Sequence, residues 1–334
     1  MKSVQVTAPG HLAHTDTAEP APADGAHAVV RISTAGICGT DVKILSGAIG
    51  VDYPRIMGHE MVGTVEVAAA TGPRAGRRVL IDPAIVCGAC ALCRKGRANL
   101  CLQGGLLGRD ADGVFAEYAT APAHRLLEVP EEISPSAAGM LQVLGTCVHA
   151  QRSSPTSVGD VAVVLGLGVS GMLFTQLLRA AGATVVGVTR SEWKRDLARR
   201  LGAAAVAAPE DAEPLVREMT GGLGADLVVE AVGTEATLAQ AIELAAVGGE
   251  VVVFGTLTGG GRGLPYYQLY FKELTLWNPR AATADDYARG IELAASGTLD
   301  LEAIVTDHFD LAEAAAAFER VNSADSLKVL MSVG

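Results

Sequence analysis

The stretch VAVVLGLGVSG, residues 161–171, decides the fold of this chain. VAVVL is a continuous apolar run typical of a buried strand, and Gly166, Gly168 and Gly171 follow it in a G-x-G-x-x-G pattern that opens a helix. In such a turn the first glycine allows the tight bend, the second lets the backbone approach a pyrophosphate, and the third lets helix and strand pack closely. The phosphates then face free N–H groups at the positive helix end. This context predicts dinucleotide binding, with Val169 and the three glycines cradling the pyrophosphate.

The sequence after this turn continues the same pattern. Apolar strands at 184–189, 226–232 and 250–255 alternate with helical segments, which predicts βαβ units and a doubly wound parallel sheet of Rossmann type. Residues 1 to about 140 instead contain short β-runs separated by glycine and proline turns, which favours an antiparallel, barrel-like domain. We expect the first domain to span 1–142, the dinucleotide-binding domain 143–282, and residues 283–334 to return to the first domain.

The end of the second strand of the parallel sheet decides which dinucleotide is preferred. An NAD site places an acidic residue there to accept from the ribose 2′-OH. Here the strand runs into Thr189, Arg190 and Ser191, with Lys194 beyond, and Glu192 comes one turn too late. Hydroxyls and basic groups suit a 2′-phosphate, although the same residues could begin a solvated helix. We expect NADP(H) to be preferred over NAD(H).

Four cysteines in CGACALCRKGRANLC predict a metal site. Zinc bound by four thiolates is tetrahedral and closed, so it braces a loop without performing chemistry. The chain opens MKSVQVTAPG, without an apolar signal segment, so we expect a reducing cytoplasm and prefer zinc to disulfides. The expected ligands of this structural zinc are Cys87, Cys90, Cys93 and Cys101.

Composition restricts the partners. The net charge of −11 argues against nucleic acid, which requires clustered Lys and Arg, and no apolar run approaches the ~20 residues of a membrane helix. We therefore expect a small-molecule ligand, with neither nucleic acid nor membrane as a partner.

The ordered motifs GICGTD, GHEMVG, the cysteine quartet, G-x-G-x-x-G, GVFAEY and FKELTL resemble the zinc-containing medium-chain alcohol dehydrogenase family over the whole chain. The resemblance implies a GroES-like β-barrel catalytic domain built from both chain ends, a Rossmann domain, and a second, catalytic zinc. It makes Cys38 and His59 zinc ligands, with Asp41 and Glu60 as neighbours or exchangeable ligands. It also assigns Thr40 the hydroxyl that contacts the substrate oxygen and begins a proton relay.

The sequence departs from this family at two positions. Gln142 occupies the position of the third ligand, which is normally Cys or an acid, and neutral Gln is a poorer ligand. Gln142 could ligate through its amide oxygen, Glu60 could replace it, or the metal could be weak or absent; Cys147 is a less favoured substitute. Lys43 stands where relatives often carry a relay His, and a lysine with its ordinary pKa near 10.4 would not shuttle protons readily.

The resemblance also assigns cofactor contacts. Thr146 would line the nicotinamide pocket, Val232 and Gly233 would lie near the ribose, Gly255 near the nicotinamide, and Lys328 would reach the phosphates.

The leading hypothesis is reversible oxidation of a secondary alcohol or polyol with NADP(H), in which zinc acts as a Lewis acid on the substrate oxygen. The alternative is an NADPH-dependent reductase of an activated C=C or C=N bond without catalytic zinc. A third possibility, a non-catalytic NADPH-binding protein, conflicts with the intact Cys38 and His59 motifs. The resemblance further implies a homodimer or homotetramer, and the sequence does not identify the substrate.

Overall fold

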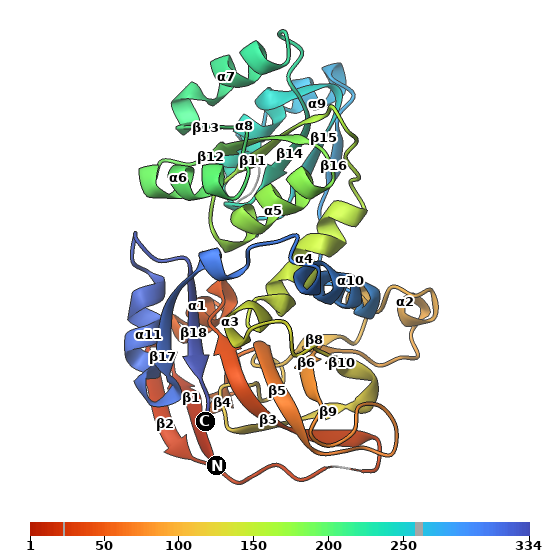
Figure 1. Ribbon diagram of the computed structural model, residues 1–334, viewed down its shortest axis with the longest axis vertical. Helices are drawn as coiled ribbons and strands as arrows, with labels where there is room; N and C mark the ends of the chain where they lie inside the picture. The colour runs from red at the N-terminus through yellow and green to blue at the C-terminus, as the bar shows by residue number, and fades with distance from the viewer. Residues whose placement is uncertain (23, 258–262) are drawn as a thin grey trace. The chain divides into compact units, whose positions relative to one another are not determined.

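The computed structural model describes residues 1–22, 24–257 and 263–334, and the chain divides into two units. Unit 1 comprises Met1–Thr146, Ala281–Gly297 and Leu301–Gly334, and unit 2 comprises Cys147–Arg280 and Thr298–Asp300. Both chain ends lie in unit 1, where their markers are close together in Figure 1.

Unit 1 is built on a mixed, mostly antiparallel sheet whose order is β10-β6-β5-β3-β18-β17, with β9 also paired to β3. The C-terminal strand β18 pairs antiparallel with β3 and parallel with β17, so the two ends of the chain share one sheet. The strands of unit 1 are β1 (Lys2–Ala8), β2 (His11–Asp16), β3 (His27–Gly36), β4 (Arg55–Ile56), β5 (Glu60–Val67), β6 (Arg78–Ile81), β7 (Ala84–Ile85), β8 (Gly105–Leu106), β9 (Tyr118–Pro122), β10 (Leu126–Glu128), β17 (Val305–Asp310) and β18 (Lys328–Ser332).

Short helices connect and cover these strands. The α-helices that begin in unit 1 are α1 (Gly39–Leu45), α2 (Ala91–Arg94), α3 (Pro135–Ala138), α4 (Leu141–Arg152), α10 (Ala284–Ala295) and α11 (Ala314–Val321). Phe115 and Phe318 meet edge-to-face in the core, with ring centroids 6.2 Å apart, and bind α11 to the sheet.

Unit 2 is the predicted doubly wound parallel sheet, and this prediction is confirmed. Its strand order is β13-β12-β11-β14-β15-β16, and every pair is parallel. Its strands are β11 (Val161–Leu165), β12 (Thr184–Val188), β13 (Ala205–Ala207), β14 (Ala225–Glu230), β15 (Ala245–Val253) and β16 (Thr275–Trp277). Its helices are α5 (Val169–Ala180), α6 (Glu192–Arg200), α7 (Ala212–Met219), α8 (Glu235–Leu244) and α9 (Tyr266–Phe271).

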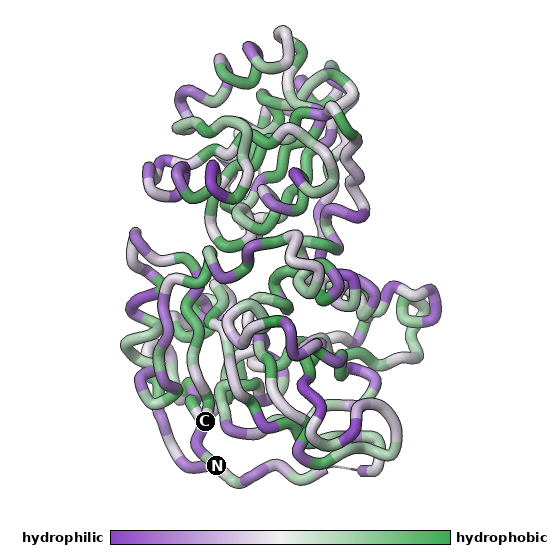
Figure 2. Tube along the Cα trace, in the orientation of Figure 1, coloured by the Kyte–Doolittle hydropathy of each residue, from purple (hydrophilic) through white to green (hydrophobic). Residues whose placement is uncertain are grey.

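The strands of unit 2 are apolar along their length because helices cover the sheet. Val163, Val186, Val228 and Val251 are fully buried, and each such valine contributes roughly 1.5–3 kcal/mol on burial. Figure 2 colours the strands of this sheet mostly hydrophobic and the helices α6 and α7 partly hydrophilic. The strand order reverses beside β11, and open parallel sheets bind ligands where this reversal occurs, at the carboxyl ends of the strands.

Five 3₁₀ helices complete the described chain: η1 (Ala98–Leu100), η2 (Ala123–Arg125), η3 (Pro209–Asp211), η4 (Glu302–Ile304) and η5 (Leu311–Glu313). Within 1–22, 24–257 and 263–334, no helix is both long and apolar enough to cross a bilayer.

Candidate functional site

The four cysteines of the quartet come together in unit 1. Their sulfurs all lie within 4.8 Å of one another. The Cys90–Cys93 and Cys87–Cys101 sulfur pairs are 3.5 Å apart, and Cys90 and Cys101 are 4.0 Å apart. A tetrahedron with Zn–S bonds of about 2.3 Å requires sulfurs about 3.8 Å apart. The donor set therefore fits one closed zinc ion.

Backbone N–H groups donate to three of these sulfurs, and they lower the pKa of Cys90 and of Cys101. Cys87 N donates to Cys101 Sγ and Cys90 N to Cys87 Sγ, both at 3.3 Å, and Cys93 N donates to Cys90 Sγ at 3.5 Å. The N–H groups of Cys93 and Leu102 lower the pKa of Cys90 to about 6. Donors aimed at sulfur favour the thiolate, which is the form that binds zinc.

A second cluster contains Cys38, His59 and Glu60, whose ligand atoms also lie within 4.8 Å of one another. Two strands bring them together: Glu60 begins β5 and is registered with Gly36 at the end of β3, and Cys38 follows as the N-cap of α1. A thiolate, an imidazole and a carboxylate are all zinc donors, and three protein ligands leave a position open for substrate. This donor set fits a catalytic rather than a structural zinc.

Asp41 connects the two loops of this cluster. Its carboxylate accepts from Cys38 N at 2.9 Å and from Gly58 N at 3.3 Å, and it is fully buried. Its Oδ1 faces His59 Nδ1 at 3.5 Å. Burial lowers the pKa of His59, but the facing Asp41 and Cys38 outweigh burial and raise it well above 6.5. Asp41 and Cys38 therefore favour a positive charge on the His59 imidazole.

Lys328 also contacts this cluster, although the sequence predicts that it reaches the cofactor phosphates. Its Nζ pairs with Glu60 and donates to the Ile37 carbonyl at 3.1 Å, and its side chain is 3% exposed. Gly36 makes room for it, because a Cβ there would lie 2.7 Å from Lys328 Cε. The ammonium therefore has partners within unit 1, and its contact with the cofactor phosphates stays a prediction.

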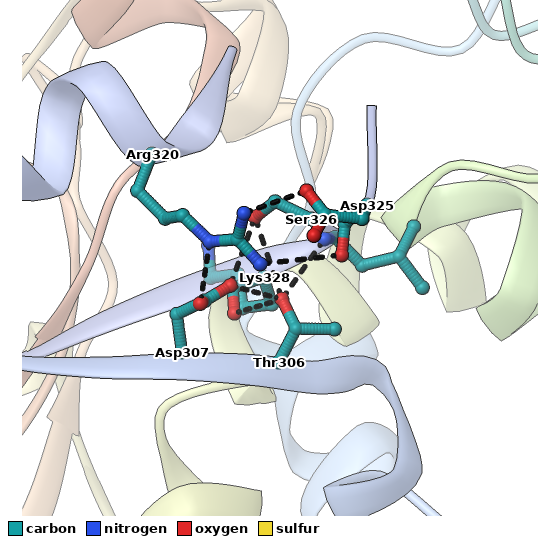
Figure 3. A network of polar contacts seen from close by, with 7 residues as sticks. Thr306, Asp307, Arg320, Asp325, Ser326 and Lys328 are labelled. Atoms are coloured by element: carbon teal, nitrogen blue, oxygen red, sulfur yellow. Dashed lines mark hydrogen bonds and ion pairs between the residues drawn. The ribbon is translucent and has the colours of Figure 1, made fainter. Parts of the chain in front are cut away.

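A polar network at the edge of unit 1 holds the strand that carries Lys328 (Figure 3). Arg320 on α11 bonds Asp307 and Asp325, each at 2.6 Å. Thr306 Oγ1 donates to the Lys328 carbonyl at 3.4 Å. The network joins α11, β17 and β18, so Lys328 projects from an anchored strand.

The remaining predicted residues of the metal site have the following surroundings. Gln142 lies on α4, is 7% exposed, and its Nε2 donates to Tyr287 Oη at 3.3 Å. Thr40 is half-buried on α1, and Lys43 on the same helix is exposed, as expected for a solvent-facing lysine. Cys147 is fully buried and belongs to neither cysteine cluster.

A cavity of about 580 Å³ in unit 2 lies at the carboxyl ends of the strands around the glycine turn. This volume is within the range of cofactor sites. Of the predicted cofactor residues, it is lined by Gly166, Gly168, Thr189, Arg190, Lys194 and Val232.

The glycine turn has the backbone geometry that its pattern requires. Gly166 has a φ of +93°, and a Cβ on Gly171 would lie 1.9 Å from the Gly166 carbonyl oxygen. A Cβ on Gly168, in contrast, would meet nothing within 4 Å, because this position faces the cavity. The first and third glycines therefore serve the fold, and the second leaves space for a ligand.

Arg195 braces the turn that follows β12. Its guanidinium donates to the Thr189 carbonyl at 2.8 Å and to the Arg190 carbonyl at 3.1 Å. Lys194 lies over the Trp193 ring, 5.2 Å from its centroid, and burial lowers the pKa of Lys194. Within residues 1–22, 24–257 and 263–334, the lining of the cavity includes Arg190 and Lys194 and no acid.

Several predicted cofactor residues do not line this cavity: Thr146, Val169, Gly171, Ser191, Gly233, Gly255 and Lys328. Thr146 belongs to unit 1, where its hydroxyl donates to the Val143 carbonyl at 2.7 Å. Gly233 and Gly255 lie side by side, since a Cβ on Gly255 would be 2.2 Å from Gly233 N.

The sequence reasoning missed Glu230, which organises the wall of the cavity. Its Oε1 accepts from Val232 N at 2.9 Å, Gly233 N at 2.8 Å and Thr237 Oγ1 at 2.7 Å, and the residue is fully buried. An acid that ends the apolar strand β14 was a signal available in the sequence. Thr234, Thr237 and Gln240, which also line the cavity, carried no such signal.

Comparison with known proteins identifies the family of this chain. Residues 24–131 match the alcohol dehydrogenase GroES-like domain, and residues 169–296 match the zinc-binding dehydrogenase domain. L-threonine 3-dehydrogenase of Bacillus subtilis is 31% identical over 94% of this chain and 94% of its own length. Sorbitol dehydrogenase of Halalkalibacterium halodurans is 29% identical over 97% of this chain and 96% of its own length.

Two solved dehydrogenase structures have the same fold as this chain. A zinc-binding dehydrogenase of Sinorhizobium meliloti bound to NADP is 31% identical, with a TM-score of 0.92 over 99% of this chain and 98% of that one. A protein of E. coli CFT073 described as a short chain alcohol dehydrogenase, complexed with NADH, is 26% identical, with a TM-score of 0.92 over 99% of both chains. The chain thus belongs to the zinc-containing medium-chain alcohol dehydrogenase family and is an oxidoreductase of that kind.

Proposed function

We propose that this oxidoreductase interconverts a secondary alcohol or polyol and its carbonyl compound, uses NADP(H), and holds a catalytic zinc at Cys38 and His59. The observation that carries the proposal is the cluster of Cys38, His59 and Glu60, because it offers zinc three donor types with an open position. The names of the relatives support the substrate class: threonine has a secondary hydroxyl, and sorbitol is a polyol.

Zinc and nicotinamide, when bound, supply Lewis acidity and the hydride acceptor. The chain's own residues hold and orient these groups. Asp41 fixes the loops of Cys38 and His59, and Lys328 holds Glu60 beside them. Thr40, two residues after Cys38 and half-buried, takes the alcohol proton. Because Lys43 is exposed, we assign the next proton transfer to solvent rather than to that side chain.

The preference for NADP(H) rests on the cavity of unit 2. A ribose 2′-OH would be recognised by an acid, whereas a 2′-phosphate requires cations and hydroxyls. Arg190, Lys194 and Thr189 line the cavity, and among the residues that the structure describes no carboxylate lines it, since Glu230 lies behind Val232 and Thr237. One solved relative carries NADP and another carries NADH, so both cofactors occur among proteins with this fold.

The same proposal includes a homodimer or homotetramer. Helix α9 exposes Tyr266, Tyr267, Tyr270 and Phe271, each more than half exposed. Tyr267 and Phe271 stack with their ring centroids 6.0 Å apart. Large exposed aromatic patches are typical of protein interfaces.

Steady-state kinetics with a panel of polyols, vicinal diols and β-hydroxy amino acids test the proposal. We expect oxidation with NADP⁺ at a higher kcat/KM than with NAD⁺. Arg190→Ala should lower kcat/KM for NADPH about 10-fold or more, as expected for a lost charge-assisted bond, and leave NADH almost unaffected. Arg200→Ala, which removes an exposed arginine at the end of α6 away from the cavity, is the matched control. A wild-type preference for NADH would refute the cofactor assignment.

A further inference from the structure

Gln142, which the family resemblance places at the third ligand position, contacts a buried tyrosine. Its Nε2 donates to Tyr287 Oη at 3.3 Å, and the two residues are 7% and 2% exposed. Among residues 1–22, 24–257 and 263–334, its side chain makes no other hydrogen bond. The amide nitrogen thus has a partner within the protein, and the amide oxygen does not.

The tyrosine is held firmly against the helix that carries Gln142. A Cβ on Gly145, in the next turn of α4, would lie 2.2 Å from the Tyr287 ring. On α10, Gly290 lies against Leu144, with 3.4 Å from its would-be Cβ to Leu144 Cγ. These two glycines let α4 and α10 approach closely. The phenol oxygen is therefore a fixed acceptor.

The phenol also keeps its proton. Burial, followed by the charge of Asp82, raises the pKa of Tyr287 far above its ordinary value of 10. A neutral hydroxyl can accept from the amide N–H₂ group at any working pH. The contact therefore does not depend on titration in the physiological range.

The turn between α3 and α4 lies against the strands of the metal cluster. A Cβ on Gly139, three residues before Gln142, would lie 3.0 Å from Leu330 and 3.3 Å from Thr34. Leu330 belongs to β18, which carries Lys328, and Thr34 to β3, which leads to Cys38.

An amide can bind a metal only through its oxygen, because the N–H₂ group has no available lone pair. The two ends of the amide are similar in size, so a glutamine without a fixed partner can present either end. A carboxylate has two equivalent oxygens and a thiolate has one sulfur, so neither ligand can present a non-ligating end to the metal. A glutamine at this position therefore requires a group that selects the orientation.

We propose that Tyr287 is a positioning residue that holds Nε2 of Gln142 and so presents Oε1 to the metal bound by Cys38 and His59. Gln142 is then the third ligand in place of Glu60, which stays paired with Lys328, and one position remains open for substrate. The inference rests on the proposed function, since it assumes a zinc at that cluster. Tyr287 does not touch the substrate or the metal in this arrangement. It acts through the orientation of Gln142.

Zinc affinity of the holoenzyme in two backgrounds tests the proposal, measured by chelator competition with the four-cysteine site as internal reference. Tyr287→Phe should weaken the Cys38–His59 site about 10-fold, in the range of second-shell changes. It should also shift the d–d absorption of the cobalt-substituted protein. In a Gln142→Glu background, either carboxylate oxygen can bind the metal. There Tyr287→Phe should weaken the zinc affinity of the Cys38–His59 site by less than about 3-fold. Tyr118→Phe, which removes a hydroxyl elsewhere in unit 1, should change neither readout.

Equal weakening in the Gln142 and Gln142→Glu backgrounds would mean that Tyr287 acts only on packing, and would overturn the proposal. Unchanged zinc affinity in Tyr287→Phe would overturn it as well. Thermal unfolding of the metal-free variants shows whether the phenylalanine is tolerated. A wild-type chain that binds zinc only at the four cysteines would instead refute the proposed function, so the two failures are distinguishable.

Discussion

Lys328 forms an ion pair with Glu60, and the two side chains are 3% and 2% exposed. The partners are 268 residues apart in the chain, and they meet because β18 and β5 both flank β3. Lys328 also binds the carbonyl that precedes Cys38, and Glu60 directly follows His59. The Lys328 ammonium therefore contacts both the loop that carries Cys38 and the loop that carries His59. The Asp41 carboxylate connects the same two loops through its bonds to Cys38 N and Gly58 N.

Lys328→Met should destabilise unit 1 by about 3–5 kcal/mol, because it leaves the Glu60 carboxylate buried without its partner. Chemical unfolding of the metal-free protein measures this loss. Adding Glu60→Gln removes the uncompensated charge and should restore part of the stability. Lys43→Met, which changes an exposed lysine, is the control. An unfolding midpoint for Lys328→Met equal to that of the wild type would show that the pair has no structural role.

Cys101→Ser should remove the structural zinc and leave the second zinc in place. Cys101 is the buried member of the quartet, and its sulfur accepts from Cys87 N. We expect zinc content to fall by about one ion per chain and the thermal midpoint to fall with it, because a closed zinc site contributes to folding. Cys147→Ser, at a buried cysteine outside both clusters, is the matched control. Retention of all bound zinc in Cys101→Ser would contradict the four-thiolate site.

Two alanine substitutions in the glycine turn should have opposite effects. Gly168→Ala should leave the thermal midpoint nearly unchanged and weaken NADPH binding, because its Cβ would point into open space needed by the ligand. Gly171→Ala should lower the midpoint even without cofactor, because its Cβ would lie 1.9 Å from a backbone oxygen. Calorimetry and fluorescence titration separate the two effects. Unchanged NADPH binding in Gly168→Ala, with a lowered thermal midpoint, would mean that the pyrophosphate does not approach Gly168.

The features that were predictable from the sequence are local. The glycine turn and the cysteine quartet lie within 11 and 15 consecutive residues, so their spacing alone indicates their chemistry. Cys38 and His59 required the family resemblance, because the register of β3 and β5 brings them together. Thr189 and Arg190 follow a strand that the sequence predicts, and both line the cavity at the end of that strand.

The features that could not be predicted depend on distant partners. Lys328 pairs with Glu60 through the strand order, which no local pattern encodes, so the sequence does not predict this ion pair. The contact between Gln142 and Tyr287 similarly depends on the approach of α4 to α10. Glu230 was missed because an acid within an apolar strand end can also be a solvated residue, whereas here it binds three donors.

The zinc content of the wild type and of Cys38→Ser, measured together with NADP⁺-dependent alcohol oxidation, tests the catalytic metal most directly. We expect about two zinc ions per chain in the wild type, and about one in Cys38→Ser with loss of activity, because only the four-cysteine site would remain. About one zinc ion in an active wild type, unchanged by Cys38→Ser, would contradict a zinc-dependent alcohol dehydrogenase and favour a reductase that needs no catalytic metal.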